Sequence, residues 1–86
     1  MSKFRNNQDF YDHIDQSCIR LRQIGLTTEA DRINHLLYKV AWTSTAELFG
    51  ELESAFHALV TGPNASKLTP ELSAELAGYL KVLANS

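Results

Sequence analysis

Two aspartate–histidine pairs are the side chains of this 86-residue chain that could bind a metal ion. Asp9 precedes His13 by four positions, and Asp31 precedes His35 by the same spacing. Residues four apart share a helix face, so each pair could supply two ligands to zinc or a similar ion. The same spacing also produces ordinary surface pairs worth about 0.2–0.5 kcal/mol. Because the sequence has neither an HExxH motif nor a His/Cys cluster, we predict no metal site and no cofactor.

Covalent catalysis would need an activated nucleophile, and the sequence offers no clear one. Cys18, the single cysteine, falls in the apolar stripe of the first predicted helix. A buried thiol keeps its proton and does not react. No serine lies in a GxSxG-type turn, and the four glycines are isolated rather than gathered in a phosphate-binding loop. We therefore expect that the protein is not an enzyme.

A line of residues on the second predicted helix indicates a binding surface instead. At about 100° per residue, one side of this helix carries Asp31, His35, Tyr38 and Trp42. Tyrosine and tryptophan anchor many protein interfaces because they give large, stiff contact areas. Two other arrangements are open: a neighbouring helix covers this side, or the helix ends before Trp42 and the indole turns inward.

Small residues recur every four positions on the third predicted helix, at Gly50, Ser54 and Ala58. Glycine inside a helix costs about 1 kcal/mol, so a close approach by another helix backbone would explain it. That helix could belong to a partner or to this chain. The partner-binding residues that we predict are His35, Tyr38, Trp42, Gly50 and Ser54.

Three helix-start signals in the sequence indicate where the helices that position these residues begin. Thr28 and Ser44 each stand three positions before a carboxylate, as in a capping box, and Thr69 precedes a proline at the first helical position. Apolar residues at spacings of three and four follow each signal. These patterns predict four helices, over residues 7–24, 29–42, 45–61 and 70–84. If the Ser44 signal is not a helix start, the second and third helices fuse into a kinked rod.

We therefore predict an all-α fold, a small antiparallel four-helix bundle. Residues 1–86 form a single helical domain, with residues 1–6 as a flexible N-terminal segment. The third helix is the most apolar and should be central to the core.

Composition excludes several classes of function. The net charge is −2, and no run of Lys or Arg exceeds one residue, so we expect no nucleic-acid partner. A helix-turn-helix fails too, because residues 45–61 contain neither Lys nor Arg. No apolar run approaches the roughly 20 residues of a membrane span, so no membrane association is expected. The lone cysteine favours a reducing compartment, and we expect a cytoplasmic protein.

These observations favour a small cytoplasmic protein that binds another protein or forms a homodimer. One alternative is a ligand- or metal-binding protein that uses Asp9, His13, Asp31 and His35 between helices. Another is an acidic, immunity-like regulator that neutralises a larger partner, although a charge of −2 is too small to argue from.

Overall fold

The computed structural model describes residues 4–85 of the chain, and this part is an all-α bundle, as predicted. Its elements are α1 (Asn7–Gln23), α2 (Thr27–Tyr38), α3 (Thr45–Thr61), the short 3-10 turn η1 (Ala65–Lys67) and α4 (Pro70–Ala84). The bounds of α3 and α4 match the prediction, and α1 ends one residue earlier. The second helix differs at both ends.

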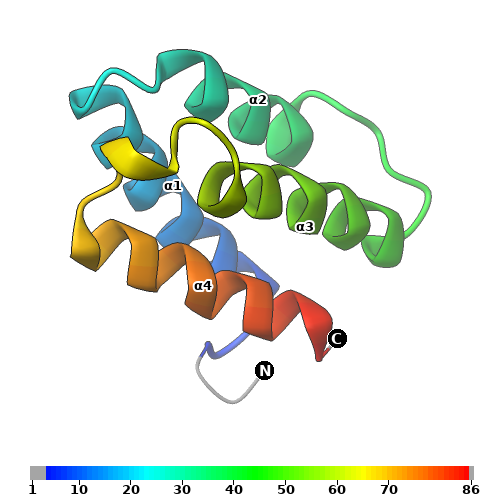
Figure 1. The fold of residues 1–86 in the computed structure, drawn as a ribbon. Coiled ribbons are helices and arrows are strands. Elements are labelled where there is room, and N and C mark those ends of the chain that lie inside the picture. Colours follow the sequence, from blue (N-terminus) through cyan, green and yellow to red (C-terminus); the bar gives the residue numbers. More distant parts are fainter. Residues whose placement is uncertain (1–3, 86) are drawn as a thin grey trace.

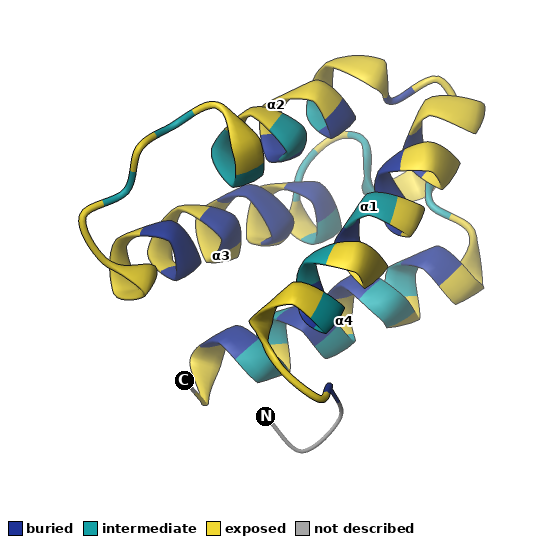
Figure 2. Ribbon diagram, turned by 180° about the vertical axis from the view of Figure 1, so that it is seen from behind, coloured by how far each residue is buried: buried dark blue, intermediate teal, exposed yellow. Residues whose placement is uncertain are grey.

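The helices form a ring of neighbours in chain order (Figure 1). α3 and α4 lie side by side and run in opposite directions, joined through η1, while α2 lies along the other side of α3. α1 crosses behind this layer and contacts both α2 and α4. Seen from behind, the buried sides of the helices face one another around a common interior (Figure 2).

The core follows the predicted apolar stripes, and aromatic rings fill its centre. Phe10 of α1 is fully buried, with its ring centroid 5.9 Å from that of Phe49 and 5.7 Å from that of Tyr79. Other apolar residues with at most 1% of their surface exposed come from all four helices: Ile14, Leu21, Ala30, Ile33, Leu52, Phe56, Leu72 and Leu76. Every helix therefore buries its apolar face against the same core.

Two of the three predicted helix starts are confirmed by their hydrogen bonds. The backbone N–H of Glu47 donates to Ser44 Oγ at 3.3 Å, and that of Leu72 donates to Thr69 Oγ1 at 3.2 Å. Each side-chain oxygen satisfies an amide that the first helical turn leaves without a partner. The carboxylate of Glu47 also accepts from the Ser44 and Thr43 hydroxyls. α2 and α3 are therefore separate helices.

The predicted capping box at Thr28 is wrong, because α2 begins at Thr27 and has no side-chain cap. The preceding turn sets this start. Gly25 has a φ of +88°, and the N–H of Leu26 donates to the Leu21 carbonyl at 2.8 Å. This left-handed glycine ends α1 and drives Leu26 into the core, where it is 2% exposed. Burial of Leu26 thus starts α2 before the predicted cap.

The predicted end of the second helix at residue 42 is also wrong, because α2 stops at Tyr38. The Trp42 indole turns back, and its Nε1–H donates to the Leu36 carbonyl oxygen at 2.6 Å. Carbonyls in the last turn of a helix have no partner within the helix. The side chain of Trp42 therefore caps α2 from outside and packs partly against the core.

Residues 4–6, which belong to the N-terminal segment expected to be flexible, make contacts with α1. Phe4 is only 4% exposed, and its ring lies 5.0 Å from that of Phe10 between centroids. Asn6 caps α1, because its Oδ1 accepts from the Asp9 N–H at 2.9 Å. Residues 1–3 of the predicted segment lie outside the described part of the chain.

Candidate functional site

Of the four residues predicted to line the outer side of the second helix, Asp31, His35 and Tyr38 lie on α2 and are exposed, while Trp42 lies beyond its end. Asp31 accepts from Arg22 Nη2 of α1 at 2.6 Å, and the Tyr38 hydroxyl donates to Asp15 Oδ2 of α1 at 2.5 Å. Trp42 lies beyond the end of the helix and is bonded back to it. His35 is exposed. Asp31, His35 and Tyr38 nevertheless remain exposed, Tyr38 to 48%, so contacts with α1 cover this side of α2 only in part.

The α1–α2 contact contains a carboxylate with an unusual environment. Asp15 Oδ1 is buried and has no hydrogen-bond partner among residues 4–85. The other carboxylate oxygen, Oδ2, accepts the hydrogen bond from the Tyr38 hydroxyl. Burial, followed by the bond to Asp15, raises the pKa of Tyr38 well above its usual range. The phenol therefore remains a hydrogen-bond donor at neutral pH.

Cys18 is 2% exposed on the core side of α1, as its place in the apolar stripe predicted. Burial, reinforced by the nearby Asp15 carboxylate, raises the pKa of this thiol to about 11. The thiol stays protonated at neutral pH, which is the unreactive form.

Sequence reasoning missed a polar cluster between α1 and α4. Ser17, which is 1% exposed, has its Oγ 2.7 Å from the Tyr79 hydroxyl and 3.1 Å from Glu75 Oε2. The Tyr79 hydroxyl also donates to the His13 carbonyl at 3.0 Å, and Arg20 pairs with Glu75 at 2.5 Å. The available signal was that Ser17 and Tyr79 are polar residues on apolar stripes. The cluster joins α1 to α4, and its Ser17 and Tyr79 hydroxyls are buried.

The candidate metal ligands do not gather at one point. His13 packs its ring edge-on against Phe4, and its Nδ1 lies 2.8 Å from the Asp9 carbonyl oxygen. Asp31 is paired with Arg22. In the described part of the chain, no three His, Cys, Asp or Glu side chains are arranged to hold a metal ion. The two aspartate–histidine pairs therefore do not combine into a single ligand set.

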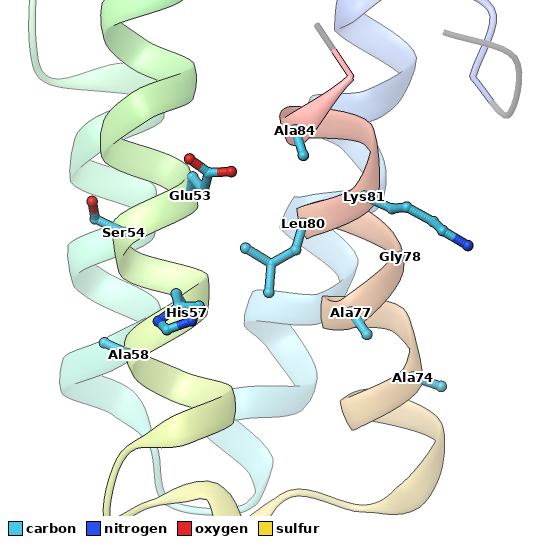
Figure 3. A pocket seen from close by; sticks show the side chains of 10 residues that line it. All are labelled: Glu53, Ser54, His57, Ala58, Ala74, Ala77, Gly78, Leu80, Lys81 and Ala84. Atoms are coloured by element: carbon cyan, nitrogen blue, oxygen red, sulfur yellow. The ribbon is translucent and has the colours of Figure 1, made fainter.

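An open groove of about 1060 Å³ runs along the outer face of α3 and α4 (Figure 3). We call it the α3/α4 groove. Most of its lining residues are small, and Leu80 is the large apolar side chain that projects between the two helices. Its polar side chains include Glu53, His57 and Lys81. The small lining residues are Ser54, Ala58, Ala74, Ala77, Gly78 and Ala84.

The small residues predicted on the third helix belong to this open face. Ser54 and Ala58 line the groove, and Gly50 lines an adjoining hollow of about 380 Å³ next to Phe49 and Leu83. A Cβ added at Gly50 would meet nothing within 4 Å. Close packing by another helix of this chain therefore does not explain the glycine.

Half of the groove was missed from the sequence, because its second wall belongs to α4. On the side of α4 that faces away from the core, the lining residues recur at spacings of three and four: Ala74, then Ala77 or Gly78, then Lys81. This pattern could have been noticed, but alanine is common on exposed helices. Only the pairing of α3 with α4 makes two small-residue faces into one groove.

The charges around the groove are uneven. α3 exposes Glu47, Glu51 and Glu53 and contains no Lys or Arg. Lys81 on α4 is the cation among the lining residues. Among the ion pairs formed by residues 4–85, none involves Glu53 or Lys81. Both charges are therefore available to a molecule that enters the groove.

Comparison with protein-family models, with curated proteins and with solved structures gives no significant match in any of the three. None of the helices described between residues 4 and 85 has the length and apolar character needed to cross a lipid bilayer.

Proposed function

We propose that this protein is a non-enzymatic protein-interaction module, and that the α3/α4 groove is its binding surface. The observation that carries the proposal is the open, small-residue face that two adjacent helices present to solvent. Of the residues predicted to bind a partner, Gly50 and Ser54 lie on this face. His35, Tyr38 and Trp42 do not line it.

The shape of the groove suits an α-helix. Helices pack with axes about 8–10 Å apart, and the shortest separations need small side chains at the contact. Two antiparallel helices with alanine, glycine and serine on their outer face leave a channel between their ridges. Glycine in an exposed helix costs about 1 kcal/mol unless packing compensates, and this face carries both Gly50 and Gly78. Docking of a helix supplies that compensation.

We place this function in the cytoplasm. The chain has one cysteine and therefore no internal disulfide. A small domain without a disulfide is typical of a compartment where thiols stay reduced.

A photo-crosslinking amino acid at position 77, in the protein expressed in its own cells, tests the proposal. We expect a discrete protein adduct from Ala77 in the groove, and none from the matched position Ala41, which is exposed in the loop between α2 and α3. The adduct should disappear when Ala58→Arg fills the groove, with helicity checked by circular dichroism. Absence of an adduct from Ala77, or equal adducts from Ala41, would show that the groove is not a binding surface.

A further inference from the structure

We infer that the occupant of the α3/α4 groove is a second copy of this chain. In this arrangement, α4 of each copy lies in the groove of the other, about a two-fold axis parallel to α4. Lys81 of each copy then meets Glu53 of the other. The inference rests on the proposed function, because it uses the same groove and adds the identity of the partner.

The directions of two charged side chains carry the inference. Glu53 on α3 and Lys81 on α4 lie at a similar level along the groove, and the Lys81 side chain extends off the flank of α4 that faces away from α3 (Figure 3). Neither forms an ion pair within the described chain. Lys81 therefore projects toward a position that its own α3 does not occupy.

A two-fold axis parallel to the helices places the Glu53 carboxylate of a second copy at that position. Such a rotation keeps every residue at its level along the axis and exchanges the two sides of the groove. When α4 of the second copy enters the groove, its outer flank faces α3 of the first copy. Lys81 of the second copy then points at Glu53 of the first. The same contact occurs twice, because two-fold interfaces are self-complementary.

The small residues make the required approach feasible. α4 is both a wall of its own groove and the helix that enters the other one, so its exposed face must be narrow. Ala77 and Gly78 keep the exposed face of α4 narrow, and Leu80 is the large apolar side chain that α4 carries into the groove. The two α4 helices would contact each other at Leu80, the side chain that extends from α4 toward α3 and therefore toward the entering helix.

Charge complementarity favours a second copy over an unrelated acidic or neutral helix. α3 alone would repel another acidic helix, because its exposed charges are all glutamates. The second copy brings a cation at the level of Glu53 and receives one in return. A basic helix of a different protein would satisfy only the α3 side and leave Lys81 without a partner. The symmetric pairing uses both unpaired charges.

The size of the face limits the strength of the dimer. A standard interface covers about 800 Å² per partner, roughly one-sixth of the 5126 Å² surface of this chain. α4 has 15 residues and is about 22 Å long, so one helix in one groove gives an interface at or below this size. We expect a dimer with a dissociation constant on the order of micromolar, weakened by salt.

Two charge-reversal variants of the purified chain, tested alone and as a mixture, test the arrangement. Sedimentation equilibrium measures the dissociation constant of the dimer in each case. Glu53→Lys alone places two lysines at each contact, and Lys81→Glu alone places two glutamates there. Each variant should raise the dissociation constant roughly tenfold at low salt. An equimolar mixture should recover dimers, because each contact in the mixed pair again joins opposite charges. An ion pair within one chain would not be recovered by mixing.

The control variant is Glu51→Lys, which makes the same charge change on an exposed position of α3 that does not line the groove. It should leave the dissociation constant within about threefold of the original value. A chain that stays monomeric at millimolar concentration overturns the inference, and so does a mixture that associates no better than its components. In either case, an adduct from Ala77 to a different protein would still support the proposed function. The two failures are therefore distinguishable.

Discussion

The phenolic oxygen of Tyr79 should contribute measurably to stability, because it joins α4 to α1 inside the core. Tyr79 is 4% exposed, and its hydroxyl donates to the His13 carbonyl at 3.0 Å and lies 2.7 Å from Ser17 Oγ. Tyr79→Phe removes this oxygen and leaves the ring in place against Phe10 and Phe56. The change therefore tests the hydrogen bonds separately from aromatic packing.

The expected loss follows from what the substitution leaves behind. Ser17 Oγ can still donate to Glu75 Oε2, 3.1 Å away, so no buried donor is stranded. Two hydroxyl protons serve the three contacts, and the variant keeps the bond from Ser17 to Glu75, so the net cost is one hydrogen bond, or about 0.5–1.5 kcal/mol of unfolding free energy. With a specific unfolding entropy of about 2.1 cal/mol/K per residue, 86 residues correspond to about 0.18 kcal/mol per kelvin. The melting temperature should fall by roughly 3–8 °C.

Urea and thermal unfolding followed by circular dichroism measure this loss, with Tyr11→Phe as the matched control. Tyr11 is partly buried beside Phe10, and no hydrogen bond from its hydroxyl is found within residues 4–85, so its loss should stay below about 0.5 kcal/mol. A double-mutant cycle of Tyr79→Phe with Ser17→Ala should show a coupling above about 0.5 kcal/mol. If Tyr79→Phe proved as mild as Tyr11→Phe, the assignment of a stabilising role to this cluster would be wrong.

Three further predictions concern the α2 terminus, the glycines and the buried thiol. Trp42→Phe removes the donor that caps the last turn of α2 and should lower stability by about 1 kcal/mol in urea unfolding; an unchanged midpoint would contradict this role. Gly50→Ala should raise stability by about 0.5–1 kcal/mol in dilute solution, because its Cβ enters open space. Gly62→Ala should lower stability, because its Cβ would overlap the Ala58 carbonyl oxygen, and melting curves that rank the two variants alike would refute this contrast. Since the Cys18 pKa is raised from 9.0 to about 11, the folded state holds this proton longer than the unfolded chain, so stability should be level below pH 9 and fall between pH 9 and 11. Cys18→Ala should reduce that fall in melts across this range, and an identical pH profile would exclude the thiol as its source.

Much of the fold was predictable because helices are specified by contacts three and four residues apart. Ser44 and Thr69 cap their helices through bonds to residues three positions on, and α3 and α4 begin and end where the sequence indicates. The second helix was misjudged for a tertiary reason. Burial of Leu26 sets its start, and the returning indole of Trp42 caps its end. Neither contact leaves a periodic signal.

The candidate site was predictable only in part, for the same reason. Gly50 and Ser54 were recognisable as an unusual small-residue line on one helix. Whether that line was covered depended on which helices packed beside it. Tyr38 is 48% exposed, and its bond to Asp15 of α1 likewise depends on how α1 packs beside α2.

The sequence by itself determined the all-α class, the two capped helix starts and the apolar faces that must be buried, because these depend on local spacing and on transfer of side chains from water. It also determined the acidity of α3 and the single buried cysteine. The tertiary structure decided which helices became neighbours. Pairing α3 with α4 placed Ser54 and Ala58 on one open face with Ala77 and Gly78, and it set Glu53 and Lys81 on the two helices that line one groove. A surface that spans two helices depends on their relative position, and no pattern within either helix specifies that position.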